Sequence, residues 1–310
     1  MSKFKFLSTA CLLAGFGCLN IMPSLSAEAM QIQKIPEITL NNGYKMPYLG
    51  LGTYTLREDA AEAVKTALKL GYRHIDTAQA YKNEAEVYKG IEESGIDRKE
   101  IFITTKISPK NMYAHNVRAA LDESLQKLGG DYIDLVLIHF PIKGNGLIKE
   151  TWQILEEYVK NGKVRSIGVS NFKKQHLDDL MSYAKIKPVL NQIEVHPYFT
   201  QEQNIADTKG YDIVVQGWSP FGSGVNNVLQ DETLQKIAQK YNKSVAQIIL
   251  RWNIQQNVLV IPRATNPDYI AENMQIFDFE LSPEDMKTIN GLNKNEPWNP
   301  LSDPDVVPWE

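Results

Sequence analysis

The sequence predicts an α/β fold in which eight parallel strands, each followed by a helix, close into a barrel. Short apolar runs rich in β-branched residues recur along the chain and are typical of strands buried on both faces. Stretches with helical spacing lie between them, for example at residues 58–70 and 116–128. Eight such runs occur at intervals of about a helix and its loops, which suits a barrel.

The predicted elements begin with a hairpin and continue as alternating strands and helices. Residues 38–46 form the hairpin, because Asn42-Gly43 is a strong signal for a tight turn between two strands. Residues 296–310 form a tail that is rich in proline and tryptophan and too irregular for a helix. We expect this tail to fold over the substrate pocket that is predicted below. The eight barrel strands are predicted near residues 49–53, 73–77, 101–106, 133–139, 164–169, 189–194, 212–218 and 258–262.

Length and composition favour a single-domain enzyme that acts on small molecules. A chain of 310 residues, 43% of them apolar, buries a large core. A net charge of −4 and a pI near 5.8, without a basic stripe, argue against a nucleic-acid partner. No His or Cys cluster has metal-ligand spacing, so we expect no metal. A monomer is the simplest expectation for the assembly.

Four polar residues close or follow predicted strands, namely Asp76, Tyr81, Lys106 and His139. Because the carboxyl ends of barrel strands meet on one face, we expect these side chains to converge. An ammonium beside a tyrosine lowers the hydroxyl pKa from about 10, and Lys106 is the candidate neighbour. Asp76 would keep Lys106 charged after burial, and His139 would orient a substrate oxygen. The group therefore predicts a carbonyl-reducing site in which Tyr81 donates a proton as a hydride arrives at carbon.

Seven short motifs resemble those of the aldo-keto reductase family and occur in the family's order between about Ile35 and Glu310. The resemblance implies a (β/α)8 TIM barrel that binds a nicotinamide dinucleotide without a Rossmann domain. It also implies reduction of aldehydes or ketones to alcohols. The motifs are Gly50-Leu-Gly-Thr53, Ile75-Asp-Thr-Ala78 with Tyr81, Thr104-Thr-Lys106, Leu137-Ile-His139, Gly168-Val-Ser-Asn-Phe172, Asn191-Gln192 and Trp218-Ser-Pro220.

The same resemblance implies which residues bind the cofactor. Ser170, Asn171 and Gln192 would hydrogen-bond the nicotinamide carboxamide. Trp218 would stack on the nicotinamide ring, to which it offers a flat apolar face. The remaining implied contacts are Ser219 and Phe221 at the pyrophosphate, Arg263 at the 2′-phosphate, and Tyr269, Glu272 and Asn273 at the adenosine end.

The adenosine end departs from the family's pattern. Where the family commonly has Lys-Ser, this chain has Arg263-Ala264, and Tyr269 stands at the position of a usual arginine. Arg263 still pairs bidentately with a phosphate. NADPH is therefore the expected cofactor, with NADH as the alternative.

The predicted substrate pocket consists of Tyr54, Tyr81, His139 and Phe140. Many family members carry tryptophan at the positions of Tyr54 and Phe140 and at that of Ser108. We therefore expect a wider or more polar mouth, and small or polar carbonyl substrates such as 2-oxoaldehydes or keto-sugars.

Other interpretations stay open at this stage. His74 and His196 lie beside strand residues but off the pattern, so we expect structural roles. Tyr198 and Trp298 are either packing residues or pocket wall. A dinucleotide-binding regulatory or sensor protein on the same barrel is the alternative function, and the presence of all four polar residues favours the enzyme.

Residues 1–29 have the features of a signal peptide. Lys3 and Lys5 precede an uncharged stretch, residues 6–22, and Ala27-Glu-Ala29 has the form of a cleavage site. These features predict export to the periplasm or secretion, leaving a barrel of residues 30–310. The stretch is shorter than about 20 apolar residues, so we expect no stable membrane insertion after processing. The alternative is translation from Met30, which would give a cytoplasmic protein.

Overall fold

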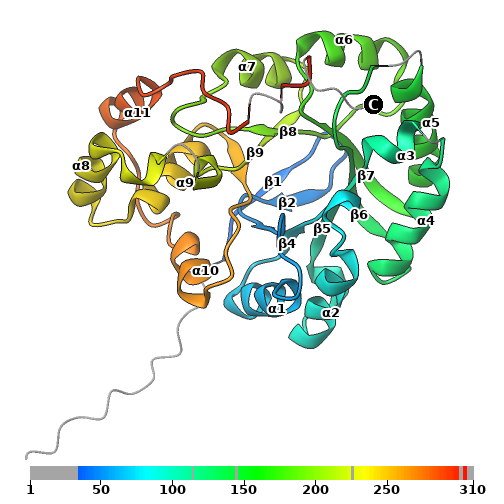
Figure 1. The fold of residues 1–310 in the computed structure, drawn as a ribbon, viewed down its shortest axis with the longest axis horizontal. Helices are drawn as coiled ribbons and strands as arrows, with labels where there is room; N and C mark the ends of the chain where they lie inside the picture. Colours follow the sequence, from blue (N-terminus) through cyan, green and yellow to red (C-terminus); the bar gives the residue numbers. More distant parts are fainter. Residues whose placement is uncertain (1–33, 114, 144–145, 225–226, 300–302, 306–310) are drawn as a thin grey trace, which may run out of the picture. The chain divides into compact units, whose positions relative to one another are not determined.

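Eight strands pair in parallel, in sequence order from β3 to β10, in the computed structural model of this protein (Figure 1). The model describes residues 34–113, 115–143, 146–224, 227–299 and 303–305. Every predicted barrel strand is present, with boundaries shifted by a few residues at most. The strands are β3 (Leu51–Gly52), β4 (His74–Asp76), β5 (Phe102–Ile107), β6 (Ile133–Ile138), β7 (Val164–Ser170), β8 (Leu190–Glu194), β9 (Val214–Trp218) and β10 (Val258–Val260).

The first and last strands of this sheet are joined by backbone hydrogen bonds, which close the barrel. Leu49 and Val260 form a parallel bridge, and the N–H of Gly52 donates to the carbonyl oxygen of Pro262 at 3.1 Å. A Cβ added to Gly52 would lie 2.6 Å from the carbonyl oxygen of Ile261. Glycine is therefore required for the backbones to approach this closely.

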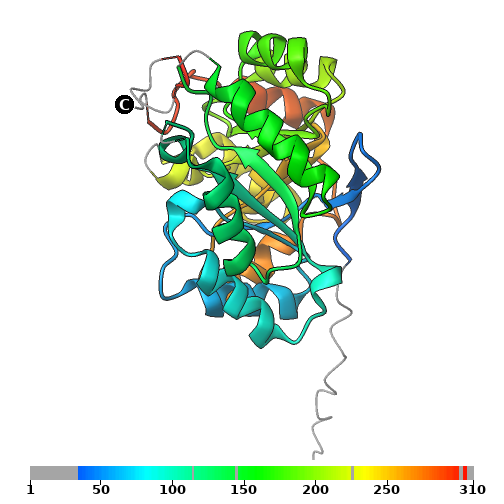
Figure 2. The same cartoon turned by 90° about the vertical axis from the view of Figure 1, so that its right-hand side faces the viewer.

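At least one helix follows each barrel strand and covers the outside of the barrel (Figures 1 and 2). The helices predicted at 58–70 and 116–128 are confirmed as α1 and α4. One face of α1 is buried, including Val64, Ala67 and Leu68, and the helix ends at Gly71, whose φ is 115°. The helices are α1 (Ala60–Leu70), α2 (Glu84–Ser94), α3 (Pro109–Tyr113), α4 (Val117–Lys127), α5 (Leu147–Lys160), α6 (Lys174–Tyr183), α7 (Glu202–Gly210), α8 (Glu232–Tyr241), α9 (Val245–Gln255), α10 (Pro267–Met274) and α11 (Pro283–Asn290).

The predicted hairpin forms from β1 (Glu37–Thr39) and β2 (Lys45–Pro47) and covers the amino-terminal end of the barrel. Leu40 and Met46 are buried in one cluster with leucines of the barrel strands. The amide of Asn41 donates to the carbonyl oxygens of residues 188 and 212, which precede β8 and β9. In Figure 2 the blue hairpin and the red tail lie on opposite sides of the barrel. The carboxyl ends of the strands are thus left for the site.

The tail has neither helix nor strand at residues 296–299 and 303–305, the parts that the structure describes. No helix within the described ranges is long and apolar enough to cross a membrane. The signal peptide predicted at residues 1–29 lies outside the described residues and stays a prediction.

Candidate active site

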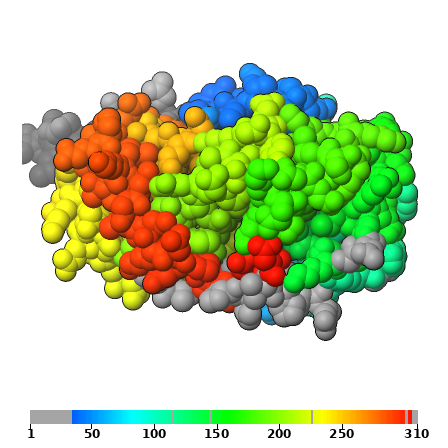
Figure 3. Space-filling model, turned by 90° about the horizontal axis from the view of Figure 1, so that it is seen from above, coloured from blue at the N-terminus to red at the C-terminus, as the bar shows by residue number. Residues whose placement is uncertain are grey.

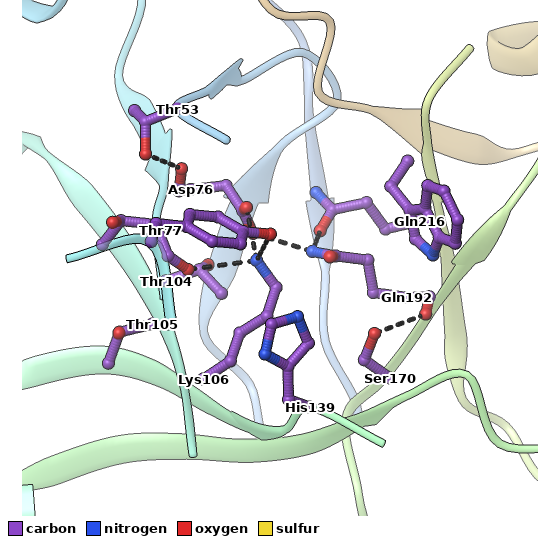
Figure 4. Close-up of polar contacts among 12 residues, drawn as sticks. Thr53, Asp76, Thr77, Thr104, Thr105, Lys106, His139, Ser170, Gln192 and Gln216 are labelled. Atoms are coloured by element: carbon purple, nitrogen blue, oxygen red, sulfur yellow. Dashed lines mark hydrogen bonds and ion pairs between the residues drawn. The ribbon is translucent and has the colours of Figure 1, made fainter. Parts of the chain in front are cut away.

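Three of the four predicted residues, Asp76, Lys106 and His139, come together at the carboxyl ends of neighbouring strands (Figure 4). The fourth, Tyr81, lies with its hydroxyl beside Lys106. Asp76 ends β4, Lys106 lies in β5, and His139 directly follows β6. Tyr81 ends the short 3₁₀ helix η1 (Gln79–Tyr81) that follows β4. The expectation of convergence is therefore met by the geometry.

Lys106 is the centre of this group, and its side chain is fully buried. Its Nζ donates to Oδ1 of Asp76 at 2.5 Å, to the carbonyl oxygen of Thr77 at 3.0 Å and to the hydroxyl of Tyr81 at 3.2 Å. An ammonium has three donors, and each therefore has a partner.

Asp76 is held through both carboxylate oxygens. Oδ2 accepts a hydrogen bond from Nε2 of Gln192 at 2.7 Å, and the same amide donates to Oε1 of Gln216 at 2.7 Å (Figure 4). The backbone carbonyl of Asp76 accepts from the Thr53 hydroxyl at 2.9 Å. These bonds fix the carboxylate beside Lys106. Sequence reasoning missed Gln216, although strand alternation places it on the same face of β9 as Trp218.

The loop that carries Tyr81 is fastened on both sides. Asn83 donates to the carbonyl oxygens of Thr53 at 2.9 Å and Leu56 at 2.8 Å, and accepts from the Thr77 hydroxyl at 2.7 Å. On the other side, Oε1 of Gln79 accepts from the N–H of residue 108 at 3.0 Å. These contacts over long sequence separations position the Tyr81 hydroxyl, and no local pattern predicts them.

Burial and the neighbouring charges set the protonation states of the group. Burial raises the pKa of Tyr81, while the Lys106 ammonium opposes this rise without reversing it. The prediction that Lys106 lowers the pKa of Tyr81 below its ordinary value is therefore wrong for this arrangement, although the ammonium acts in that direction. Burial works to lower the pKa of Lys106, but Asp76 and Tyr81 outweigh it, so this pKa is raised. Tyr81 consequently holds its proton and Lys106 its charge at neutral pH.

His139 faces Tyr81 as a neutral ring. The two ring centroids lie 5.8 Å apart at an angle of 75°. Burial, aided by the charge of Lys106, lowers the pKa of His139 to about 3. A neutral imidazole has one N–H to donate, so His139 can bind an oxygen without adding charge.

The four residues expected to hold a nicotinamide form one hydrogen-bonded chain. Asn171, whose φ is 63°, donates to the Ser170 hydroxyl and to the backbone carbonyl of His139, both at 3.0 Å. Its Oδ1 accepts from Nε1 of Trp218 at 3.0 Å, which fixes the indole ring. The Ser170 hydroxyl donates to the backbone carbonyl of Gln192 at 2.9 Å. These side chains offer both donors and acceptors, as a carboxamide does. A bound carboxamide would therefore replace some of the hydrogen bonds among them.

Beyond Trp218 the chain turns sharply. Ser219 has a φ of 53°, and its hydroxyl forms a hydrogen bond with that of Ser223. Phe221 is half-buried and packs against the core. The two serine hydroxyls therefore meet within the turn that directly follows Trp218.

The predicted adenosine contacts are more scattered. Arg263 donates to the Thr55 hydroxyl at 2.9 Å and pairs with no carboxylate within the described part of the chain. Tyr269 is 61% exposed, while Asn273 is buried. The carboxylate of Glu272 accepts a hydrogen bond from the Ser244 hydroxyl. Arg263 therefore has free donors that suit a phosphate, and Tyr269 an open ring face.

Aromatic rings line the mouth of the predicted pocket. The Tyr54 ring lies 5.1 Å from that of Tyr81 and 6.4 Å from that of Trp298, and Trp298 lies 6.5 Å from Trp218. Phe140 lies 5.6 Å from His139 on the other side. The part of the tail around Trp298 thus lies at the mouth of the predicted pocket, and the Trp298 ring belongs to the pocket wall. The rim is aromatic rather than more polar, because the tail supplies a ring from outside the barrel; the wider mouth stays a prediction.

His74 and His196, which were expected to have structural roles, are buried in the barrel. His74 is fully buried and lies 3.1 Å from the Thr104 hydroxyl, and His196 is fully buried beside Glu194. Tyr198 is packing, because it is buried and its hydroxyl donates to Asp231 at 2.8 Å. Within the ranges that the structure describes, no three His, Cys, Asp or Glu side chains are grouped to hold a metal ion.

Comparisons with known proteins agree with this geometry. The model of the Aldo/keto reductase family matches residues 48–294. The chain is 47% identical over 268 residues to a glyoxal reductase of Bacillus subtilis (strain 168), covering 86% of this chain and 96% of that protein. It is 42% identical over 272 residues to a morphine 6-dehydrogenase of Pseudomonas putida, covering 84% and 92%.

Solved structures give the same result for the fold. A Bombyx mori aldo-keto reductase in complex with NADP superimposes with a TM-score of 0.82 at 41% identity, covering 87% of this chain and 97% of that one. An aldo/keto reductase from Brucella melitensis gives a TM-score of 0.80 at 44% identity, covering 84% and 100%. The (β/α)8 barrel is thus shared across nearly the whole length of these chains.

Proposed function

The chain belongs to the aldo/keto reductase family, and from this membership we propose that it reduces aldehydes or ketones to alcohols with Tyr81 as proton donor. One observation carries the assignment of roles. The hydroxyl of Tyr81 lies 3.2 Å from the buried ammonium of Lys106, which is itself paired with Asp76 at 2.5 Å. A protonated phenol beside a fixed positive charge is suited to deliver a proton to an oxygen that gains negative charge.

Each of the four residues has a separate task in this proposal. Tyr81 donates its proton to the substrate oxygen, and Lys106 stabilises the phenolate that remains. Asp76 keeps Lys106 protonated inside the barrel, where an unpaired ammonium would lose its charge. His139, as a neutral hydrogen-bond donor, holds the substrate oxygen in line with Tyr81.

NADPH is the cofactor of this enzyme, and it supplies the hydride when bound. We assign Ser170, Asn171 and Gln192 to its carboxamide and Trp218 to the ring face. Arg263 is the residue that would pair with a 2′-phosphate, since its guanidinium bonds only to the hydroxyl of Thr55 among the described residues. We assign Ser219 and Phe221 to the pyrophosphate, and Tyr269, Glu272 and Asn273 to the adenosine end.

We further propose 2-oxoaldehydes or keto-sugars as the substrate class. The similarity to a glyoxal reductase supports the first of these. Tyr54, Tyr81, His139 and Phe140 would surround the reacting group.

The test is dinucleotide oxidation, followed by absorbance, with a panel of methylglyoxal, aromatic aldehydes and keto-sugars. We expect turnover with NADPH and alcohol formed in equal amount. Tight dinucleotide binding without turnover on any carbonyl would instead support the regulatory or sensor protein.

For location we propose export through the N-terminal segment, with translation from Met30 as the alternative. Cleavage after Ala29 and a start at Met30 leave the same first residue, so N-terminal sequencing does not separate them. Ala27→Leu combined with Ala29→Leu should block cleavage and accumulate a longer precursor in cells. An unchanged product of residues 30–310 would favour the internal start.

A further inference from the structure

A buried carboxylate lies at the pocket end of β8 and takes no part in the proton transfer. Glu194 is the last residue of this strand, and its side chain is 2% exposed. Strand alternation places it on the same face as Gln192, which points into the barrel, and its register partner is Trp218. We propose that Glu194 is a positioning residue that holds Trp298 in the pocket wall and thereby selects substrates by the group beyond the carbonyl. This proposal rests on the proposed reductase function.

The contact that carries the proposal joins the barrel to the tail. Oε1 of Glu194 accepts a hydrogen bond from the backbone N–H of Trp298 at 2.6 Å, and Nε2 of His196 lies 3.1 Å from the same oxygen. A hydrogen bond to a carboxylate is short and strong compared with one between neutral groups. The bond spans 104 residues of sequence and fixes the backbone of an otherwise irregular segment.

Stability alone is a poor reason to place a carboxylate here. Oε2 of Glu194 is buried and has no hydrogen-bond partner among the described residues. Burying an acceptor without a partner opposes folding. An apolar residue would fill the position at lower cost, which points to the bond with Trp298 as the useful feature.

Trp298 is placed where it can contact substrate. Its ring lies between those of Tyr54 and Trp218, at 6.4 and 6.5 Å. Tyr54 in turn lies 5.1 Å from Tyr81, so Trp298 is two rings away from the proton donor. We therefore expect methylglyoxal, which carries only an acetyl group beyond its aldehyde carbon, to be too short to contact Trp298, whereas an aromatic aldehyde extends farther from the reacting carbon.

A second anchor holds the tail farther along. Nζ of Lys173 lies 2.7 Å from Asp303 and 2.6 Å from Asp305, and the amide of Gln175 donates to Asp305 at 3.0 Å. In Figure 3 the red residues of the tail lie against the green segment that contains α6. The Lys173 anchor is partly exposed, so we expect the buried bond of Glu194 to control the position of Trp298.

The experiment compares Glu194→Ala, Glu194→Gln and Trp298→Ala in the full chain, with methylglyoxal and an aromatic aldehyde as substrates. Glu194→Ala and Trp298→Ala should each raise KM for the aromatic aldehyde about tenfold, and Glu194→Ala should leave kcat and the KM for methylglyoxal within about twofold. Glu194→Gln keeps an acceptor oxygen for the N–H of Trp298 and should restore KM. The double variant should be no worse than either single one, because Trp298→Ala removes the ring that Glu194 is proposed to position. Glu202→Ala, at an exposed position on α7, is the control.

Any of three kinetic results would overturn the proposal. They are an unchanged KM in Glu194→Ala, an equal fall of kcat on both substrates, or effects that add in the double variant. A wild-type protein without turnover would refute the reductase but not this contact, which tryptophan fluorescence tests separately. The spectral contribution of Trp298, obtained by difference with Trp298→Phe, should change in Glu194→Ala, and no change would also overturn the proposal.

Discussion

Lys106 and Asp76 form an ion pair inside the barrel, with 2.5 Å between Nζ and Oδ1 and at most 2% of either side chain exposed. The two strands that carry them are neighbours, and Asp76 is in register with Thr104. Lys106 therefore lies two residues farther along the same face, at the height of the Tyr81 hydroxyl. The pair places a fixed positive charge next to a phenol.

Removing one member of this pair should destabilise the fold as well as stop turnover. Asp76→Asn leaves the Lys106 ammonium buried without its counter-charge, which should lower the free energy of unfolding by about 3–5 kcal/mol. Adding Lys106→Met should recover most of this stability, because two uncharged groups of similar volume remain, but no activity. Urea unfolding and NADPH oxidation measure the two effects. A double variant no more stable than Asp76→Asn would contradict this account of the pair.

Stability should fall as pH is lowered, in part because of His139. Its pKa is about 3 in the fold and about 6.5 in the unfolded chain, so only the unfolded state gains the proton between these values. The contribution is therefore fully present above pH 6.5 and is lost as pH falls towards 3. Between pH 7 and pH 5 the loss should be about 2 kcal/mol for one histidine of this kind.

The variant His139→Gln isolates the contribution of His139 to the pH dependence of the free energy of unfolding. Its free energy of unfolding, measured by urea at both pH values, should depend less on pH than that of the wild type. His74 also has its pKa lowered to about 3 by burial and remains in both proteins, so part of the pH dependence should persist. Equal differences between pH 7 and pH 5 in the two proteins would show that His139 is not held neutral.

Arg263 should decide the choice between the two dinucleotides. Arg263→Ala should raise KM for NADPH by about 10–100-fold, since a charged hydrogen-bonded contact is lost, and leave KM for NADH unchanged. Arg118→Ala is a matched control on α4, where Arg118 pairs with Glu157. Equal changes in KM for both dinucleotides would show that Arg263 does not bind the 2′-phosphate.

Closure of the barrel should depend on Gly52. Gly52→Ala places a methyl group 2.6 Å from a backbone oxygen and should lower the free energy of unfolding by about 1–3 kcal/mol. Gly210→Ala, where an added Cβ meets nothing within 4 Å, should leave stability unchanged or slightly higher. Urea unfolding of both variants makes the comparison.

Much of the fold could be predicted because its strands are buried on both faces. The apolar runs around Ile103 and Val136 follow directly from that burial. The convergence of Asp76, Lys106 and His139 also followed, since parallel strands end on one face.

What could not be predicted depends on contacts between distant segments. The bond from Trp298 to Glu194 joins an irregular tail to a strand, and neither position carries a periodic signal. The direction of the Tyr81 pKa shift depends on the balance of burial against the charge of Lys106, which only the three-dimensional arrangement defines.

The most direct test of the central claim compares Tyr81→Phe with the wild type in NADPH oxidation by an aldehyde, alongside the dissociation constant for NADPH. The proton-donor role predicts that kcat falls by about 10²–10⁴-fold while the dissociation constant stays within twofold. Tyr183→Phe, which removes a hydroxyl bonded to Asp179 on the surface, should behave as the wild type. Turnover by Tyr81→Phe within twofold of the wild type would contradict the assignment of Tyr81 as proton donor.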